Sequence, residues 1–156
     1  MTADLATTLA DYRTGLDAEL QLLHQLETLA TRQRDLPHPP GADDLTALGL
    51  ERERLLAALL ALESQLQPLR QRLLSSLPEA RELPGFAGVA ERHKRAGDLV
   101  AMIMRLDRES LDILQKADQD RRAAAQSLET GEATLAAYRR ILQQPQPSAG
   151  LFTQRG

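Results

Sequence analysis

The chain of 156 residues contains no cysteine and no tryptophan, and aromatic residues make up only 3% of it. The absence of cysteine excludes disulfide bonds, thiolate metal sites and cysteine nucleophiles. Valine and isoleucine are also scarce, whereas leucine accounts for about a fifth of the residues and alanine is abundant. Because leucine and alanine favour helix, and β-branched and aromatic residues favour strand, this composition predicts an all-α protein.

The sequence also has no segment dominated by one sign of charge. It carries 19 basic and 22 acidic side chains, which give a net charge of −3 and alternate along the chain. Nucleic-acid binding needs a concentrated positive surface, so we expect no nucleic-acid partner. The densest basic stretch, residues 92–95, lies between Glu91 and Asp98 and is interpreted as a solvated helix start.

Long apolar runs are missing as well. The longest compact run, "LVAMIM" at 99–104, covers less than two helical turns, too short to span a bilayer. The opening "MTADLATTLADYRTG" lacks the basic region and apolar core of a secretory signal. With 42% apolar and 26% charged residues, the balance is that of a globular protein. We therefore expect a cytoplasmic protein without membrane insertion.

Motifs that support catalysis or metal binding are also lacking. His24, His38 and His93 are scattered, and although His24 shares a helix face with Glu27, no Glu-x-x-His motif completes a di-iron site. The glycine-rich stretch at 85–90 lacks the lysine and the preceding strand of a nucleotide-binding loop. We expect no catalytic residues, no metal site and no cofactor, and we interpret His24 and Glu27 as a surface polar pair.

Leucines at spacings of three and four predict three long helices at about 2–35, 43–77 and 89–144. Proline and glycine end the first helix in "LPHPPG" at 36–41 and the second in "SSLPEARELPGFAG" at 75–88, where Pro78 could start one extra turn. The apolar stripes are Leu5, Leu9, Tyr12, Leu16, Leu20, Leu23 and Leu26 in the first helix, Leu55, Leu59, Leu62, Leu66, Leu69 and Leu73 in the second, and Ala96, Val100, Ile103, Leu106, Ser110, Leu114, Ala117, Arg121, Ala124, Leu128, Gly131, Leu135, Tyr138 and Leu142 in the third.

Two residues interrupt these stripes. Gly15 is a local weak point in the first helix, worth roughly 1 kcal/mol relative to alanine. Pro68 removes one amide donor and crowds the carbonyl of Ser64, but the leucine phase continues on both sides of it. Pro68 therefore predicts a kink in the second helix and not a boundary.

Together the stripes predict an elongated, coiled-coil-like antiparallel bundle of three helices, forming one domain over residues 1–144 and followed by a flexible tail at 145–156. At ~1.5 Å per residue, the first two helices span roughly 50 Å each and the third roughly 80 Å. The third helix should therefore extend past the others over about 125–144. Its amphipathic end would then be exposed as a partner site, unless Gly131 lets it fold back.

The arrangement resembles the flagellar export chaperones of the FlgN type. The resemblance is carried by the leucine-rich first helix, the Pro-rich loop before "DLTALGLERERLLAALLALESQL" with its "ERLL" stretch at 53–56, the long third helix, and an ending with "AYR" at 137–139 and "RG" at 155–156. It covers nearly the whole chain. FliT-type flagellar chaperones have a similar leucine-rich helical layout and are a near alternative.

The resemblance implies a chaperone that binds hook–filament junction subunits, the hook-associated proteins, and keeps them competent for type III secretion. The implied partner is such a secreted subunit or a component of the export gate, and client binding is attributed to the C-terminal region. Carried over to this chain, the partner-binding residues are Leu128, Leu135, Tyr138, Ile141, Leu142, Leu151 and Phe152.

Other hypotheses remain at this point. The third helix could pair with a second copy and form a structural homodimer without a client. Peripheral lipid binding is disfavoured because lysine, tryptophan and phenylalanine are nearly absent from the helical apolar faces. Leu151 and Phe152 in the tail would either contact a client together with the third helix or fold back over its apolar face.

Overall fold

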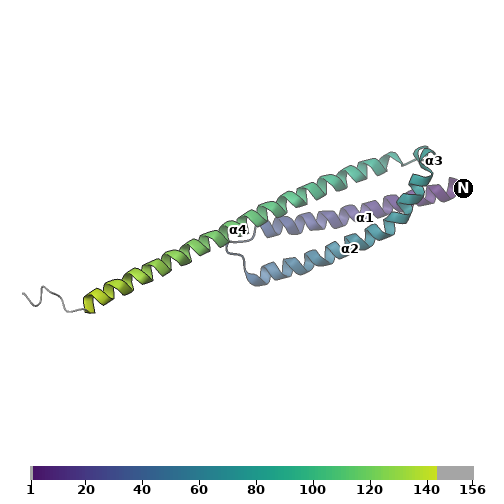
Figure 1. The fold of residues 1–156 in the computed structure, drawn as a ribbon. Helices are drawn as coiled ribbons and strands as arrows, with labels where there is room; N and C mark the ends of the chain where they lie inside the picture. Colours follow the sequence, from purple (N-terminus) through teal and green to yellow (C-terminus); the bar gives the residue numbers. More distant parts are fainter. Residues whose placement is uncertain (1, 144–156) are drawn as a thin grey trace, which may run out of the picture. The chain divides into compact units, whose positions relative to one another are not determined.

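The structure, a computed structural model, describes the backbone of residues 2–143 (Figure 1). Over this range the chain forms four helices and no strand, which confirms the all-α prediction. None of these helices is long and apolar enough to cross a membrane. The helices are α1 (Thr2–Arg34), α2 (Ala42–Ser75), α3 (Leu77–Arg81) and α4 (Ala87–Gln143).

The fold divides into two compact units, and the boundary falls inside α4. The first unit comprises residues 1–113, and the second begins at Leu114. In the second unit the described part is entirely helical and ends at Gln143. The tail predicted at 145–156 lies outside the described residues.

In the first unit, the predicted apolar stripes of α1 and α2 form the core. Every stripe residue of α1 from Leu9 to Leu26 is buried, and Leu5 packs against them. In α2, three of the six stripe leucines are buried and the other three pack against the same clusters. The spacing of leucine therefore identified the buried faces of both helices correctly.

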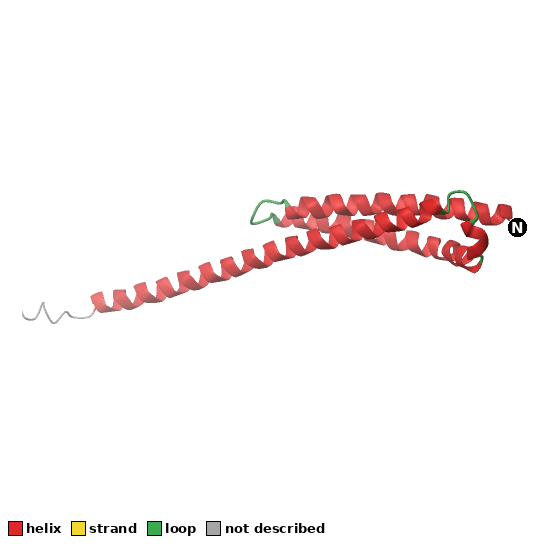
Figure 2. Cartoon of the chain, turned by 90° about the horizontal axis from the view of Figure 1, so that it is seen from above, coloured by secondary structure: helices red, strands yellow, loops and turns green. Residues whose placement is uncertain are grey.

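Apolar side chains of α1, α2 and the early part of α4 meet in two clusters, and these helices lie side by side in two views (Figures 1 and 2). The cluster near the 35–41 loop joins Leu26, Leu55 and Leu106. The cluster near α3 joins Leu16, Leu66 and Val89. At about 25 cal/mol per Å² of buried apolar surface, such clusters provide the main stabilisation of a helical fold.

Pro68 lies inside α2, and the helix continues through it. The proline and Ser64, whose carbonyl it deprives of a helical hydrogen bond, are both exposed. Water can therefore satisfy that carbonyl, which reduces the cost of a proline in the helix interior. The kink at this position remains a prediction.

The connection between α2 and α4 differs from the predicted boundary. The second helix was expected to reach residue 77 but ends at Ser75, and α3 begins at Leu77 with Pro78 in its first turn. Proline suits this position because the first amides of a helix have no internal acceptor. Gly85 then adopts φ +89°, a left-handed conformation that favours glycine, and allows the chain to enter α4.

The buried face of α4 differs from the predicted stripe at one position. Ile103, Leu106 and Ser110 are buried as expected, but Val100 is 43% exposed. Its neighbour Leu99 packs against the core instead. The prediction was wrong at Val100 because strict steps of three and four from Ala96 permitted both residues, and only the position of the neighbouring helices distinguishes them.

Ion pairs at the edges of the core also connect α4 to α1 and α2. Arg52 of α2 forms a bidentate pair with Asp107 of α4, and each side chain is about one-third exposed. Arg92 of α4 donates to Asp17 of α1 at 2.7 Å, and this hydrogen bond lowers the pKa of the Asp17 carboxyl. Such partly exposed pairs contribute little to stability.

We expect Leu106→Ala to destabilise the protein by about 2–5 kcal/mol, because Leu106 is only 4% exposed and its truncation leaves a cavity. The matched control is Leu111→Ala on the same helix, where the side chain is 53% exposed and the expected loss is below about 1 kcal/mol. Urea denaturation followed by circular dichroism measures both values. Similar losses for the two variants would contradict the assigned core.

Gly15→Ala should destabilise the protein, although alanine is the better helix former. A Cβ at this position would overlap the side chain of Leu66, which is 2% exposed and cannot swing into solvent. At Gly97, in contrast, an added Cβ meets nothing within 4 Å. Gly97→Ala should therefore raise stability by about 0.5–1 kcal/mol, and opposite shifts in thermal midpoint are expected for the two variants.

Candidate functional site

The main candidate site is the helical part of the second unit. Every residue from 118 to 143 is exposed, including all the partner-binding residues predicted within this range. The exposed fractions are 73% for Leu128, 68% for Leu135, 58% for Tyr138, 57% for Ile141 and 58% for Leu142. Large apolar side chains this exposed form a surface suited to a partner.

Four of these five residues share one face of α4. Leu128, Leu135 and Leu142 are spaced by seven residues, and Tyr138 lies three residues after Leu135. Ile141 lies beside this line, next to Tyr138, and therefore borders the face without belonging to its centre. The predicted seam thus continues through the second unit as a mostly apolar stripe that is exposed from residue 118 onward. We call it the α4 stripe and define it as positions 114, 117, 121, 124, 128, 131, 135, 138 and 142.

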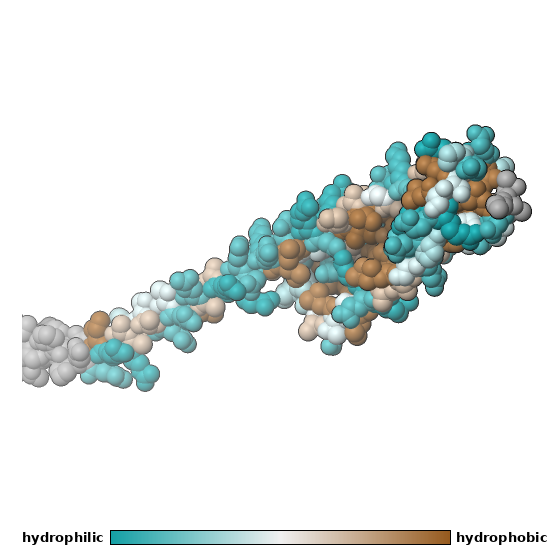
Figure 3. Space-filling model, turned by 45° about the vertical axis from the view of Figure 1, so that its right-hand side comes forward, coloured by the Kyte–Doolittle hydropathy of each residue, from teal (hydrophilic) through white to brown (hydrophobic). Residues whose placement is uncertain are grey.

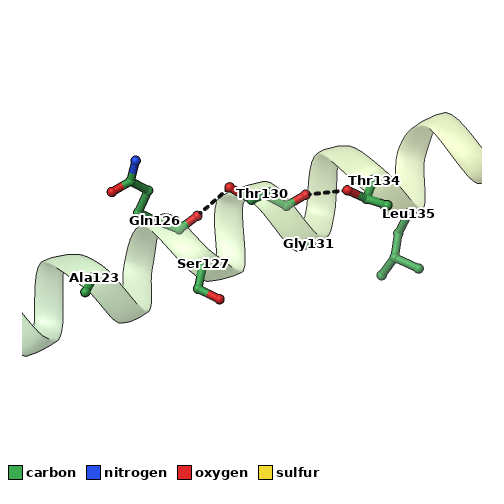
Figure 4. A pocket seen from close by; sticks show the side chains of 7 residues that line it. All are labelled: Ala123, Gln126, Ser127, Thr130, Gly131, Thr134 and Leu135. Carbon is green, nitrogen blue, oxygen red and sulfur yellow. Dashed lines mark hydrogen bonds between the residues drawn. The ribbon is translucent and has the colours of Figure 1, made fainter.

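Small residues make the surface beside the α4 stripe shallow (Figure 4). The depression is lined by Ala123, Gln126, Ser127, Thr130, Gly131, Thr134 and Leu135. Thr130 and Thr134 donate their hydroxyls to the carbonyls four residues earlier, at 2.9 Å in both cases. Since the hydroxyls are satisfied within the helix, the threonines add little demand for polar partners, and another helix could approach closely here.

Charged residues flank the stripe without dominating it, so apolar and hydrophilic surface alternate along this part of α4 (Figure 3). Arg122 pairs with Asp118 one turn earlier at 3.1 Å, and both side chains are largely exposed. Glu132 and Arg139 lie further along on the same flank as Asp118. The face therefore combines an apolar centre with charges of both signs at its edge, the usual composition of a helix–helix interface.

Two predicted partner-binding residues, Leu151 and Phe152, lie outside the described residues. Of the five predicted residues that the structure describes, Leu128, Leu135, Tyr138 and Leu142 share one face of α4, and Ile141 lies next to them.

A second polar feature, which the sequence did not indicate, lies inside the first unit. Tyr12 is 1% exposed, and its hydroxyl is 2.8 Å from Nε2 of His93 and accepts a hydrogen bond from Nε of Arg70 at 3.0 Å. Arg70 is paired in turn with Glu63 at 2.7 Å. This chain of contacts joins α1, α2 and α4 and satisfies the buried phenol, so its role here is structural.

Sequence reasoning missed this network for a clear reason. Tyr12 was assigned to an apolar stripe, where its ring does pack, and His93 was assigned to a solvated basic stretch. The two residues are 81 positions apart, and no local spacing links them. The only available signal was a tyrosine within a buried stripe, because a buried hydroxyl requires a hydrogen-bond partner.

The predicted surface pair of His24 and Glu27 is present in α1. His24 Nδ1 lies 3.8 Å from the Glu27 carboxylate, and the histidine side chain is 67% exposed. In the part of the chain that the structure describes, no group of three or more histidine, aspartate or glutamate side chains is arranged to hold a metal ion.

Comparison with known proteins gives no match: no family model fits the chain, and no curated protein or solved structure matches it. The α4 stripe and its exposure are therefore the basis for a functional conclusion.

The Tyr12 network predicts a pH dependence of stability. Partial loss of solvation, together with the nearby charge of Arg70, lowers the pKa of His93 below its ordinary value of 6.5. The unfolded chain then takes up a proton before the folded chain as the pH falls. Stability should be complete above pH 6.5 and should decrease as the pH falls through 6.5 towards the folded pKa.

The measurement compares the wild type with His93→Gln, which keeps a hydrogen-bond acceptor for Tyr12 but does not titrate. Between about pH 7.5 and about pH 5, the wild type should lose more stability than the variant. Equal losses, or an NMR titration midpoint of His93 above 6.5, would contradict the assigned network.

Proposed function

We propose that the protein is a cytoplasmic flagellar export chaperone of the FlgN type. It binds a hook–filament junction subunit through the α4 stripe and keeps that subunit soluble and competent for secretion. The proposal is supported by the exposed apolar face of α4, on which Leu128, Leu135, Tyr138 and Leu142 lie together. The resemblance in helix order and sequence supplies the client class.

The physical basis of client binding is the pairing of amphipathic helices. A secreted subunit with an unpaired amphipathic helix exposes apolar surface before assembly and tends to aggregate. A second apolar helix face can cover that surface, and anchors at spacings of three, four and seven residues match such a partner. Tyr138 and the leucines of the stripe are the anchors, since interface energy concentrates in a few large apolar side chains.

The remainder of the chain supplies the scaffold in this proposal. The first unit is an elongated antiparallel bundle formed by α1, α2 and the beginning of α4, with α2 bent at Pro68. The tail, including Leu151 and Phe152, adds contacts to the client. Binding requires no catalysis and no cofactor, because covering apolar surface is sufficient to prevent aggregation.

The test is co-purification of a hook-associated protein with the wild type and with Leu135→Asp. The substitution places a charge at the centre of the stripe and should weaken client binding by at least about tenfold. The thermal midpoint should remain close to that of the wild type, because Leu135 is 68% exposed.

Leu111→Asp is the matched control, since this leucine is also exposed on α4 but lies in the first unit. It should bind the client as the wild type does. A truncation after residue 144 measures the contribution of the tail in the same assay. Undiminished capture by Leu135→Asp, with any hook-associated protein, would refute the assignment of the client site to the α4 stripe.

A further inference from the structure

The α4 stripe has an unusual alternation of large and small residues. Its positions form two series, each with a spacing of seven residues. One series, Leu114, Arg121, Leu128, Leu135 and Leu142, is large, and the other, Ala117, Ala124, Gly131 and Tyr138, is small except at its last member. In a two-stranded coiled coil these series occupy the a and d positions of the heptad.

This alternation discriminates between orientations of a second identical helix. In a parallel pair each residue faces its own copy, so small residues meet at Ala117, Ala124 and Gly131 and leave gaps between leucine layers. The two copies of Arg121 would also face each other within the apolar seam. In an antiparallel pair, a positions face d positions, so each small residue is opposite a large one.

Charge then selects one antiparallel register. When Ala124 faces Leu135 of the second copy, Gly131 faces Leu128, Ala117 faces Leu142 and Arg121 faces Tyr138. The guanidinium can then lie over the phenol ring in a cation–π contact. On the flank of the seam, Asp118 meets Arg139 of the second copy, which forms two symmetry-related ion pairs.

Shifting the second copy by one heptad in either direction loses these advantages. A shift towards the C-terminus places Glu132 opposite its own copy. A shift towards the N-terminus places Asp118 opposite Glu132 of the second copy. In both cases like charges meet on the same flank. A shift by one further heptad towards the C-terminus leaves roughly two heptads of described helix in contact, too little for a stable pair.

The favoured register also fits the extent of the exposed surface. The paired segment runs from about residue 116 to 143, so it lies within the second unit and requires no change in the first. On the other flank, Ser127 meets Thr134 of the second copy. Both are small, and the Thr134 hydroxyl is already bonded within its own helix. The shallow surface beside the stripe therefore permits a close approach of the two helices.

From these complementarities we propose that the α4 stripe pairs with the α4 stripe of a second copy of this chain. The two helices run antiparallel, with Ala124 opposite Leu135. The pair covers the apolar face in the absence of any other partner. This self-pairing does not rest on the flagellar assignment, because it requires only the residues of the stripe and its flanks.

Single cysteines test the orientation and the register together, since the natural chain contains no cysteine. The variants are Ala124→Cys and Leu135→Cys, one of them labelled with ¹⁵N so that mass spectrometry separates mixed from identical pairs. Under mild oxidation, the mixture should form the mixed disulfide at least about tenfold more than either variant forms a disulfide with itself. Each variant alone would place its two sulfurs roughly 16 Å apart along the axis, too far for a bond.

Sedimentation equilibrium of the full chain, without any client, supplies the second measurement. The wild type and Leu111→Asp should show a concentration-dependent dimer, and Leu135→Asp should remain a monomer. A disulfide of Ala124→Cys with itself would indicate parallel pairing and overturn the proposal, as would a strictly monomeric wild type together with the absence of a mixed disulfide between Ala124→Cys and Leu135→Cys. Neither result bears on client capture, so failure of self-pairing and failure of the chaperone assignment are distinguishable.

Discussion

The structure depends on one constraint: the apolar stripe of each long helix must be covered by another surface. A helix rich in leucine on one face is stable in water only when another surface covers that face. In the first unit α1, α2 and the early part of α4 cover one another, and their leucines meet in two clusters. The stripe of α4 continues past Ile113 with the same spacing, but from residue 118 onward all its members are exposed. The proposed function follows from that difference.

Polar contacts influence how the helices of the first unit are aligned, but they are not its main source of stability. The pair of Arg52 with Asp107 and that of Arg92 with Asp17 lie at the edges of the core, where screening by water keeps their contribution small. The Tyr12 network differs because its hydroxyl is buried and must be satisfied. It ties three helices at one point and so favours one register among those that leucine packing alone would permit.

The second unit combines two requirements in one helix. In the two proposals, its large residues would provide anchors for an amphipathic partner, and its small residues would allow a close approach by a helix of the same chain. Client binding and self-pairing would use the same face and therefore compete for it. The apolar surface would then be covered whether or not a client is bound, which limits nonspecific association.

The sequence by itself determined the helical class and the buried faces of α1 and α2, because these depend on local propensity and on a spacing of three or four residues. The greater length of the third predicted helix also indicated that the end of α4 is exposed. Only the tertiary structure decided that Leu99 and not Val100 joins the core, that Gly15 must lack a Cβ beside Leu66, and that Tyr12 meets His93. These outcomes depend on how neighbouring helices are rotated and how closely they approach. No local pattern encodes the contact between two side chains that are distant in sequence.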